Sequence, residues 1–158
     1  SLSRISSDTT ITQAAVNLSV KLEDYPTVTP TSWSQLCVST RVQQGYNYAE
    51  VKGQTVVLGN AATVGIQFAS FSYFTLGNYT YPAANTSLSV TGSFDLPAGD
   101  ISSALSDPQS GSVAVQEDSA NVRFRPSTLV MQSDEGLDVT LNGTVSIDKS
   151  WLALPAGE

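Results

Sequence analysis

The segment AAVNLSVKLE, residues 14–23, alternates apolar and polar side chains and decides the fold class of this chain. Its even positions are apolar, whereas its odd positions from Asn17 onward are polar. Successive side chains of a β-strand point to opposite faces, so a period of two predicts a strand with one buried face. We therefore expect Leu18, Val20 and Leu22 to point into a hydrophobic core.

The same alternation recurs along the chain. It is present at 36–42, where Thr40 interrupts it, and again at 88–94 and 122–125. The segment 66–76 is apolar and aromatic on both faces, which predicts a strand that crosses the centre of a sheet. Glycine–asparagine pairs after residues 58 and 76 predict turns.

The C-terminal segment 137–147 permits two interpretations. Asn142-Gly143 has the composition of a two-residue hairpin turn. Such a turn would pair apolar residues with polar ones, so that neither face of the hairpin would be uniformly apolar and able to pack on a core. The apolar residues all occupy odd positions, namely Leu137, Val139, Leu141, Val145 and Ile147. We predict one long strand with a bulge at Gly143, and a three-residue loop over 142–144 is the alternative.

Helix signals are few. Asp100 and the apolar residues that follow it, up to Pro108, predict one or two helical turns with Asp100 as N-cap. Some eight to ten strands joined by long connections, such as 24–34, predict an antiparallel β-sandwich of the jelly-roll or Greek-key type, or else a barrel. We expect a single domain over 1–158. Because the chain opens with Ser1 rather than Met, we expect it to be excised from a longer polypeptide, a processed terminus or tag remnant being the alternative.

Charge argues against several partners. The chain has 7 basic and 14 acidic residues, a formal net charge of −7. Proteins that bind nucleic acid neutralise phosphates with several Lys and Arg side chains, so we expect no nucleic-acid partner. Membrane-spanning helices need about 20 consecutive apolar residues. The sequence has no such run, and we expect no membrane insertion.

The residues that carry most enzymatic chemistry are scarce. The chain has no histidine, which excludes the Ser-His-Asp triad and the usual zinc sites. Cys37 is the single cysteine, and we expect a buried, inert thiol. Acidic side chains gather at 117–118 and at 134–138, where we expect solvated strand ends rather than a calcium loop or a glycosidase pair. We therefore predict no enzymatic activity, no cofactor and no metal.

Aromatic residues supply the candidate ligand site. Exposed tyrosines can stack on sugar rings, and the alternative is cross-strand packing within the sheet. The candidate ligand-binding residues are Tyr46, Tyr48, Tyr73, Tyr79 and Tyr81. We expect the two tryptophans, Trp33 and Trp151, to lie at the edge of the core. Acceptor motifs for N-glycosylation occur at Asn17, Asn78, Asn85 and Asn142.

These observations lead us to expect a non-enzymatic module. The first hypothesis is a structural, assembly and attachment domain that faces outward from a viral capsid or phage surface, as a protruding or shell domain. It would self-associate as a dimer or trimer and contact a cell-surface glycan or receptor. The alternative is a carbohydrate-binding or adhesin-like β-sandwich of a microbial surface protein. Both hypotheses place the chain on a virion surface, on a cell surface or outside the cell.

Overall fold

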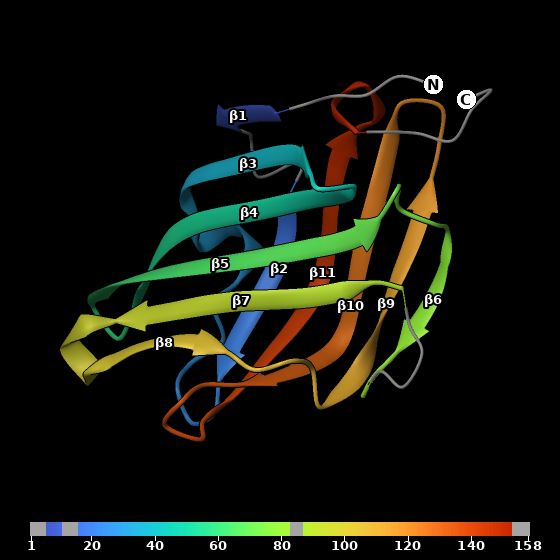
Figure 1. Ribbon diagram of the computed structural model, residues 1–158. Coiled ribbons are helices and arrows are strands. Elements are labelled where there is room, and N and C mark those ends of the chain that lie inside the picture. Colours follow the sequence, from blue (N-terminus) through green and yellow to red (C-terminus); the bar gives the residue numbers. More distant parts are fainter. Residues whose placement is uncertain (1–5, 11–15, 83–86, 153–158) are drawn as a thin grey trace.

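The computed structural model describes residues 6–10, 16–82 and 87–152, which form an antiparallel β-sandwich (Figure 1). One sheet has six strands in the order β1-β3-β4-β5-β7-β8. They are β1 (Ser6–Thr10), β3 (Ser34–Gln43), β4 (Tyr46–Val57), β5 (Asn60–Phe71), β7 (Ser89–Leu96) and β8 (Ile101–Leu105). The predicted fold class is thus confirmed, with eleven strands in the described residues rather than eight to ten.

The second sheet has five strands in the order β2-β11-β10-β9-β6. They are β2 (Val16–Leu22), β6 (Gly77–Thr80), β9 (Ser110–Glu117), β10 (Asn121–Gln132) and β11 (Asp138–Asp148). The chain changes sheets between β1 and β2, β2 and β3, β5 and β6, β6 and β7, and β8 and β9. These changes place β2, from the beginning of the chain, beside β11 from its end, so the topology is not a single meander.

Two tight hairpins build the centre of the six-stranded sheet. Gln44 and Gly45 join β3 to β4 with φ of 52° and 84°, and Leu58 and Gly59 join β4 to β5 with φ of 49° and 79°. Positive φ at both central residues is the type I′ geometry, whose twist matches that of the strands. The turn predicted near Gly59 is confirmed, one residue earlier than expected.

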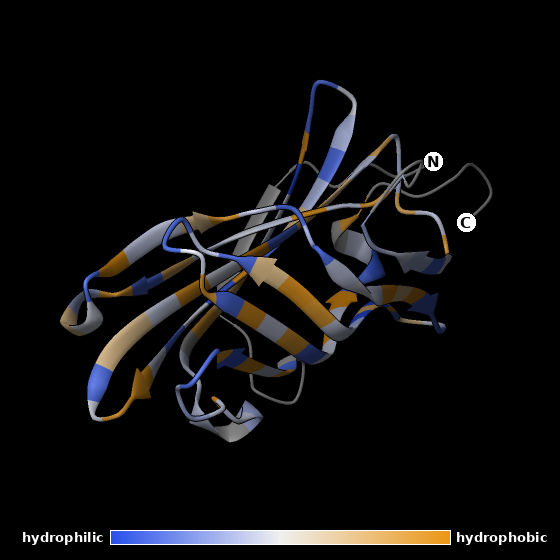
Figure 2. Ribbon diagram, turned by 90° about the horizontal axis from the view of Figure 1, so that it is seen from below, coloured by the Kyte–Doolittle hydropathy of each residue, from blue (hydrophilic) through white to orange (hydrophobic). Residues whose placement is uncertain are grey.

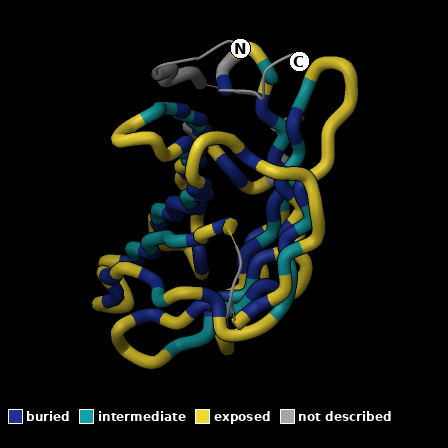
Figure 3. The backbone as a smooth tube through the Cα atoms, turned by 45° about the vertical axis from the view of Figure 1, so that its right-hand side comes forward, coloured by how far each residue is buried: buried dark blue, intermediate teal, exposed yellow. Residues whose placement is uncertain are grey.

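The two faces of the strands follow the predicted parity. Leu18, Val20 and Leu22 are at most 3 % exposed, and Leu36 and Val38 continue this pattern in β3. The alternation is visible as apolar and polar bands along the strands in Figure 2. In Figure 3 the exposed stretches gather at the connecting loops. Period-two patterning therefore identified the core faces correctly.

Aromatic packing joins the two sheets. The ring of Phe68 in β5 stacks on that of Phe124 in β10, with centroids 4.6 Å apart and planes 12° apart. Phe74 meets Phe124 edge-on, with centroids 4.9 Å apart. At the other end of the core, buried Trp33 donates a hydrogen bond from Nε1 to the carbonyl oxygen of Leu18 at 2.7 Å. Trp33 is thus buried in the core, although the sequence predicts it at the core's edge, whereas the side chain of Trp151 lies outside the described residues.

The C-terminal prediction is confirmed in its main point and corrected in one detail. β11 runs straight through Asn142-Gly143 and pairs with β2 without a register shift. The bulge lies in the neighbouring strand β10, where the register shifts toward β11 between Phe124 and Leu129 and toward β9 between Ser127 and Val130. Thr128 at this bulge has φ of 44°, and its amide donates to Asn142 Oδ1 at 2.8 Å.

Three other local predictions are wrong. Asp100 does not cap a helix: it follows a 3-10 turn over Pro97–Gly99 in a left-handed conformation, and β8 begins at the next residue. Gly77-Asn78 is not a turn but the start of β6. Cys37 is half-buried rather than fully buried, because its odd position places it on the outer face of β3.

Candidate functional site

The outer face of the six-stranded sheet carries a group of three aromatic side chains, called here the aromatic patch: Tyr46 and Phe71, which are exposed, and Tyr48, which is half-buried. Tyr46 begins β4 and lies opposite Phe71, the last residue of β5. Phe71 is 62 % exposed and Tyr46 44 % exposed. Large apolar side chains that cluster on a surface mark interaction sites more often than scattered ones do. The patch is therefore the candidate functional site.

Aromatic contacts hold the patch in one arrangement. The rings of Tyr46 and Phe71 meet edge to face, with centroids 5.3 Å apart and planes 76° apart. The Tyr48 ring lies 6.3 Å from that of Tyr46. Glycine is favoured at position 45 because its φ is 84°, and an added Cβ would also come within 3.1 Å of the Phe71 ring. The exposed rings thus support one another before any partner binds.

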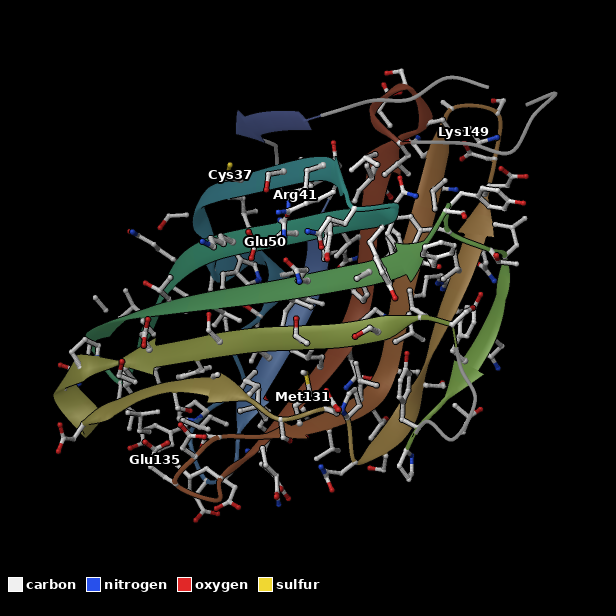
Figure 4. All side chains as sticks on the ribbon, viewed as in Figure 1. Cys37, Arg41, Glu50, Met131, Glu135 and Lys149 are labelled. Carbon is white, nitrogen blue, oxygen red and sulfur yellow. The ribbon has the colours of Figure 1, made fainter. Side chains whose placement is uncertain are left out.

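The positively charged side chain of Arg41 covers the Tyr48 ring of the patch. The Arg41 guanidinium lies 4.0 Å from the centroid of the Tyr48 ring, within the range of a cation–π interaction. Arg41 also donates from Nε to Gln43 Oε1 at 3.3 Å and from Nη2 to Gln67 Oε1 at 3.4 Å. Figure 4 shows Arg41 on the outward side of the sheet. One face of the Tyr48 ring is therefore occupied by the protein itself.

The loop after β5 is held beside the patch by hydrogen bonds. The amide of Ser72 donates to the carbonyl oxygen of Gly45 at 2.7 Å, and Asn47 Nδ2 donates to the carbonyl oxygen of Ser72. Tyr73, which follows in this loop, is 40 % exposed. The loop thus extends the exposed aromatic surface by one tyrosine.

The other two candidate tyrosines lie elsewhere. Tyr79 belongs to β6 in the second sheet, and its hydroxyl donates to the carbonyl oxygen of Thr75. Tyr81 is buried, and its hydroxyl donates to the carbonyl oxygen of Leu88 at 2.7 Å. Burial raises the pKa of the Tyr81 phenol well above its ordinary value. The structure thus brings Tyr46 and Tyr48 together, leaves Tyr73 exposed in the loop after β5, and assigns Tyr81 to the core.

Sequence reasoning missed two members of this surface. Phe71 was placed in a strand buried on both faces, although its odd position is opposite in parity to buried Ile66 and Phe68. Parity could have identified it as an outward residue. Nothing in the sequence pairs Arg41 with Tyr48, because that contact depends on the register between β3 and β4.

The acidic clusters serve local structure. Glu117 forms an ion pair with Lys149 at 2.9 Å, and Asp118 forms one with Arg123 at 2.6 Å. The labelled residues Glu135 and Lys149 lie at opposite ends of the molecule in Figure 4, so the two clusters are far apart. Within the described ranges, no group of three or more His, Cys, Asp or Glu side chains is placed to hold a metal ion.

The Asp118 carboxylate is expected to titrate well below a normal aspartate. Hydrogen bonds from the backbone amides of Ala120 and Asn121, together with Arg123, lower its pKa from 3.8 to about 2. Because the folded pKa is the lower one, this stabilisation is present above pH 3.8 and is lost as the pH falls toward 2. NMR titration of the carboxyl carbon should give a pKa near 2, and Arg123→Gln should raise it only in part. A normal value would contradict the turn geometry.

Comparisons with protein-family models, with curated proteins and with solved structures found no match for this chain. In the part of the chain that the structure describes, no helix has the length and apolar character required to cross a membrane. The function of the chain is therefore inferred from the surfaces of the sandwich alone.

Proposed function

We propose that this chain is a non-enzymatic assembly and surface-attachment module that self-associates through the aromatic patch. The single observation that carries the proposal is the exposed, pre-organised Tyr46–Phe71 pair. Tyrosine, phenylalanine and arginine are the residues enriched at the centre of protein interfaces. The patch has all three, since Arg41 is fixed over Tyr48.

The ring geometry favours a protein partner over a sugar at this patch. A sugar stacks on a flat, open aromatic face. Here the planes of Tyr46 and Phe71 are 76° apart, and Arg41 covers one face of Tyr48. An uneven, knob-like surface suits the interdigitated packing of a protein interface better. This geometry favours assembly over carbohydrate binding at Tyr46 and Tyr48.

The class of assembly that fits best is an outward-facing domain of a viral capsid or phage surface protein. The net charge of −7 suits a surface away from a nucleic-acid genome. The antiparallel sandwich without disulfides is compatible with such domains, although architecture alone does not fix function. On this proposal the chain forms a dimer or trimer on a virion surface or outside the cell.

Phe71→Thr is expected to weaken self-association by about tenfold or more, because truncation of a central aromatic removes a large share of interface energy. The matched control is Val56→Thr, a change to the same residue at a strand position that is equally exposed, 63 % against 62 % for Phe71. Val56 lies near the far end of β4 from Tyr46. Sedimentation equilibrium over a range of concentrations measures both variants against the parent chain.

The expected pattern is a self-associating parent chain, an unchanged Val56→Thr variant and a Phe71→Thr variant shifted toward the monomer. A parent chain that stays monomeric at every concentration would contradict the proposal. Equal weakening by both substitutions would also contradict it, because the effect would then be one of general surface polarity.

A further inference from the structure

A second surface lies on the opposite side of the sandwich. An open groove of about 980 Å³ runs over the outer face of the five-stranded sheet. The groove is shallow and more open than enclosed, so a ligand would lie along the surface of the sheet. The lining of the groove comes from all five strands, and three strand pairs contribute to it: Asn78 with Ala114, Ala114 with Arg125, and Thr144 with Asn17.

The chemistry of the lining is that of a hydrogen-bonding site. Asn17 and Asn78 are exposed, and within the described part of the chain their side-chain amides make no hydrogen bond. Each amide offers two donors and an acceptor. Ala114, which pairs with Asn78, is small, so a ligand can approach the sheet beside this asparagine. Such a surface suits a ligand with many hydroxyl groups.

Arg125 gives the groove a positive charge. Its Nη1 donates to Gln116 Oε1 at 3.2 Å, which fixes the guanidinium, and within the described residues it forms no ion pair. The groove's acidic residue, Glu117, is neutralised by Lys149 at 2.9 Å. The groove is therefore locally positive in a chain of net charge −7. A guanidinium binds a carboxylate through two parallel hydrogen bonds.

The β10 bulge fixes the shape of this surface. The Thr128 amide donates to Asn142 Oδ1, which lines the groove. Close approach of the strands at the bulge requires Gly111, because an added Cβ there would overlap the Thr128 carbonyl. Bulges re-aim side chains beside functional sites. The lining of the groove is thus pre-organised by backbone structure rather than by a ligand.

We propose that this groove binds an acidic oligosaccharide, with the sugar carboxylate on Arg125 and sugar hydroxyls on the amides of Asn17 and Asn78. The two contacts use different properties of the ligand, its charge and its hydroxyl groups. The site is separate from the aromatic patch, so glycan binding and self-association are independent.

Three of the four N-glycosylation motifs bear on this site. Asn17, Asn78 and Asn142 all line the groove, whereas Asn85 lies outside the described residues. N-linked glycans on these asparagines would occupy the volume that the ligand needs. Protein for the binding test is therefore produced in bacteria, where these asparagines remain unmodified.

The test measures binding of sialyllactose and trigalacturonate, with lactose and maltotriose as neutral counterparts, by titration calorimetry on dilute protein. At least one acidic probe should bind about tenfold more tightly than its neutral counterpart. Arg125→Gln should remove this preference for the acidic probe. Arg125→Lys should retain part of the preference, because the positive charge remains but the planar guanidinium, which makes two parallel hydrogen bonds, is lost. Asn78→Ala should weaken binding by about fivefold, as expected for one lost hydrogen bond.

The matched control is Lys52→Gln, which changes the net charge equally but lies on β4 of the other sheet, outside the aromatic patch. It should leave glycan binding unchanged. Binding of neither acidic probe would overturn the proposal, as would equal binding by the parent chain and Arg125→Gln, or an equal loss in Lys52→Gln. Circular dichroism of each variant verifies the fold, and sedimentation verifies that self-association is unaffected by Arg125→Gln.

Discussion

Phe124→Ala is expected to lower the free energy of unfolding by about 3–5 kcal/mol. Phe124 has no exposed surface, and its ring contacts those of Phe68 and Phe74. Because Phe68 belongs to the other sheet, the substitution opens a cavity between the two layers rather than at the surface. The neighbouring strands are hydrogen-bonded on both sides and cannot collapse into the cavity.

Urea denaturation followed by tryptophan fluorescence measures this loss, and an unchanged m-value would show that two-state unfolding is preserved. Phe71→Ala is the control, since it removes the same ring from a position that is 62 % exposed. On dilute, monomeric protein, we expect that control to cost less than about 1 kcal/mol. Similar costs for the two variants would contradict the described core.

Gly143→Ala is expected to destabilise the fold by about 3 kcal/mol or more. Gly143 has φ of 129°, and an added Cβ would overlap the carbonyl oxygen of Asn17 and come within 2.9 Å of Leu18 Cα. These atoms belong to the backbone of β2, so no side-chain rotation relieves the overlap. The substitution should therefore disturb the pairing of β2 with β11, which joins the two ends of the chain.

Gly143→Ala destabilises in two ways, through its positive φ and through the overlap of the added Cβ with the β2 backbone, and Gly59→Ala measures the first of these alone. Gly59 also has a positive φ, 79°, but an added Cβ there meets nothing within 4 Å. Gly59→Ala should lower the free energy of unfolding by about 1–2 kcal/mol, which is the cost of placing alanine in the left-handed conformation. Thermal unfolding of both variants measures the difference. A Gly143→Ala variant no less stable than Gly59→Ala would contradict the close approach of β2 and β11.

The sequence was sufficient to predict which faces are buried and the single strand at the C-terminus. Both depend on side-chain parity, which a hydrophobic core enforces over every strand that it covers. Ile101, Ser103 and Leu105 are buried alternately, so β8 obeys the same rule. It was mistaken for a helix because the proline and aspartate before it are typical of a helix start.

Features set by strand pairing could not be predicted in this way. The bulge lies in β10 rather than at Gly143, because the glycine fits the close approach of β2 while Thr128 supplies the extra residue. Tyr73 and Tyr79 are six residues apart in the sequence, yet the chain changes sheets between them. The groove joins residues from five strands, which no local pattern can bring together.

The most direct test of assembly through the aromatic patch is hydrogen exchange, compared by mass spectrometry between dilute and concentrated protein. The account predicts slower exchange at high concentration in peptides that cover 44–48 and 70–76, where the patch and its adjoining loop lie. Peptides from β9 and β10, which line the groove, should be unchanged. Association accompanied by protection of β9 and β10 alone, or by no protection of 70–76, would contradict the account.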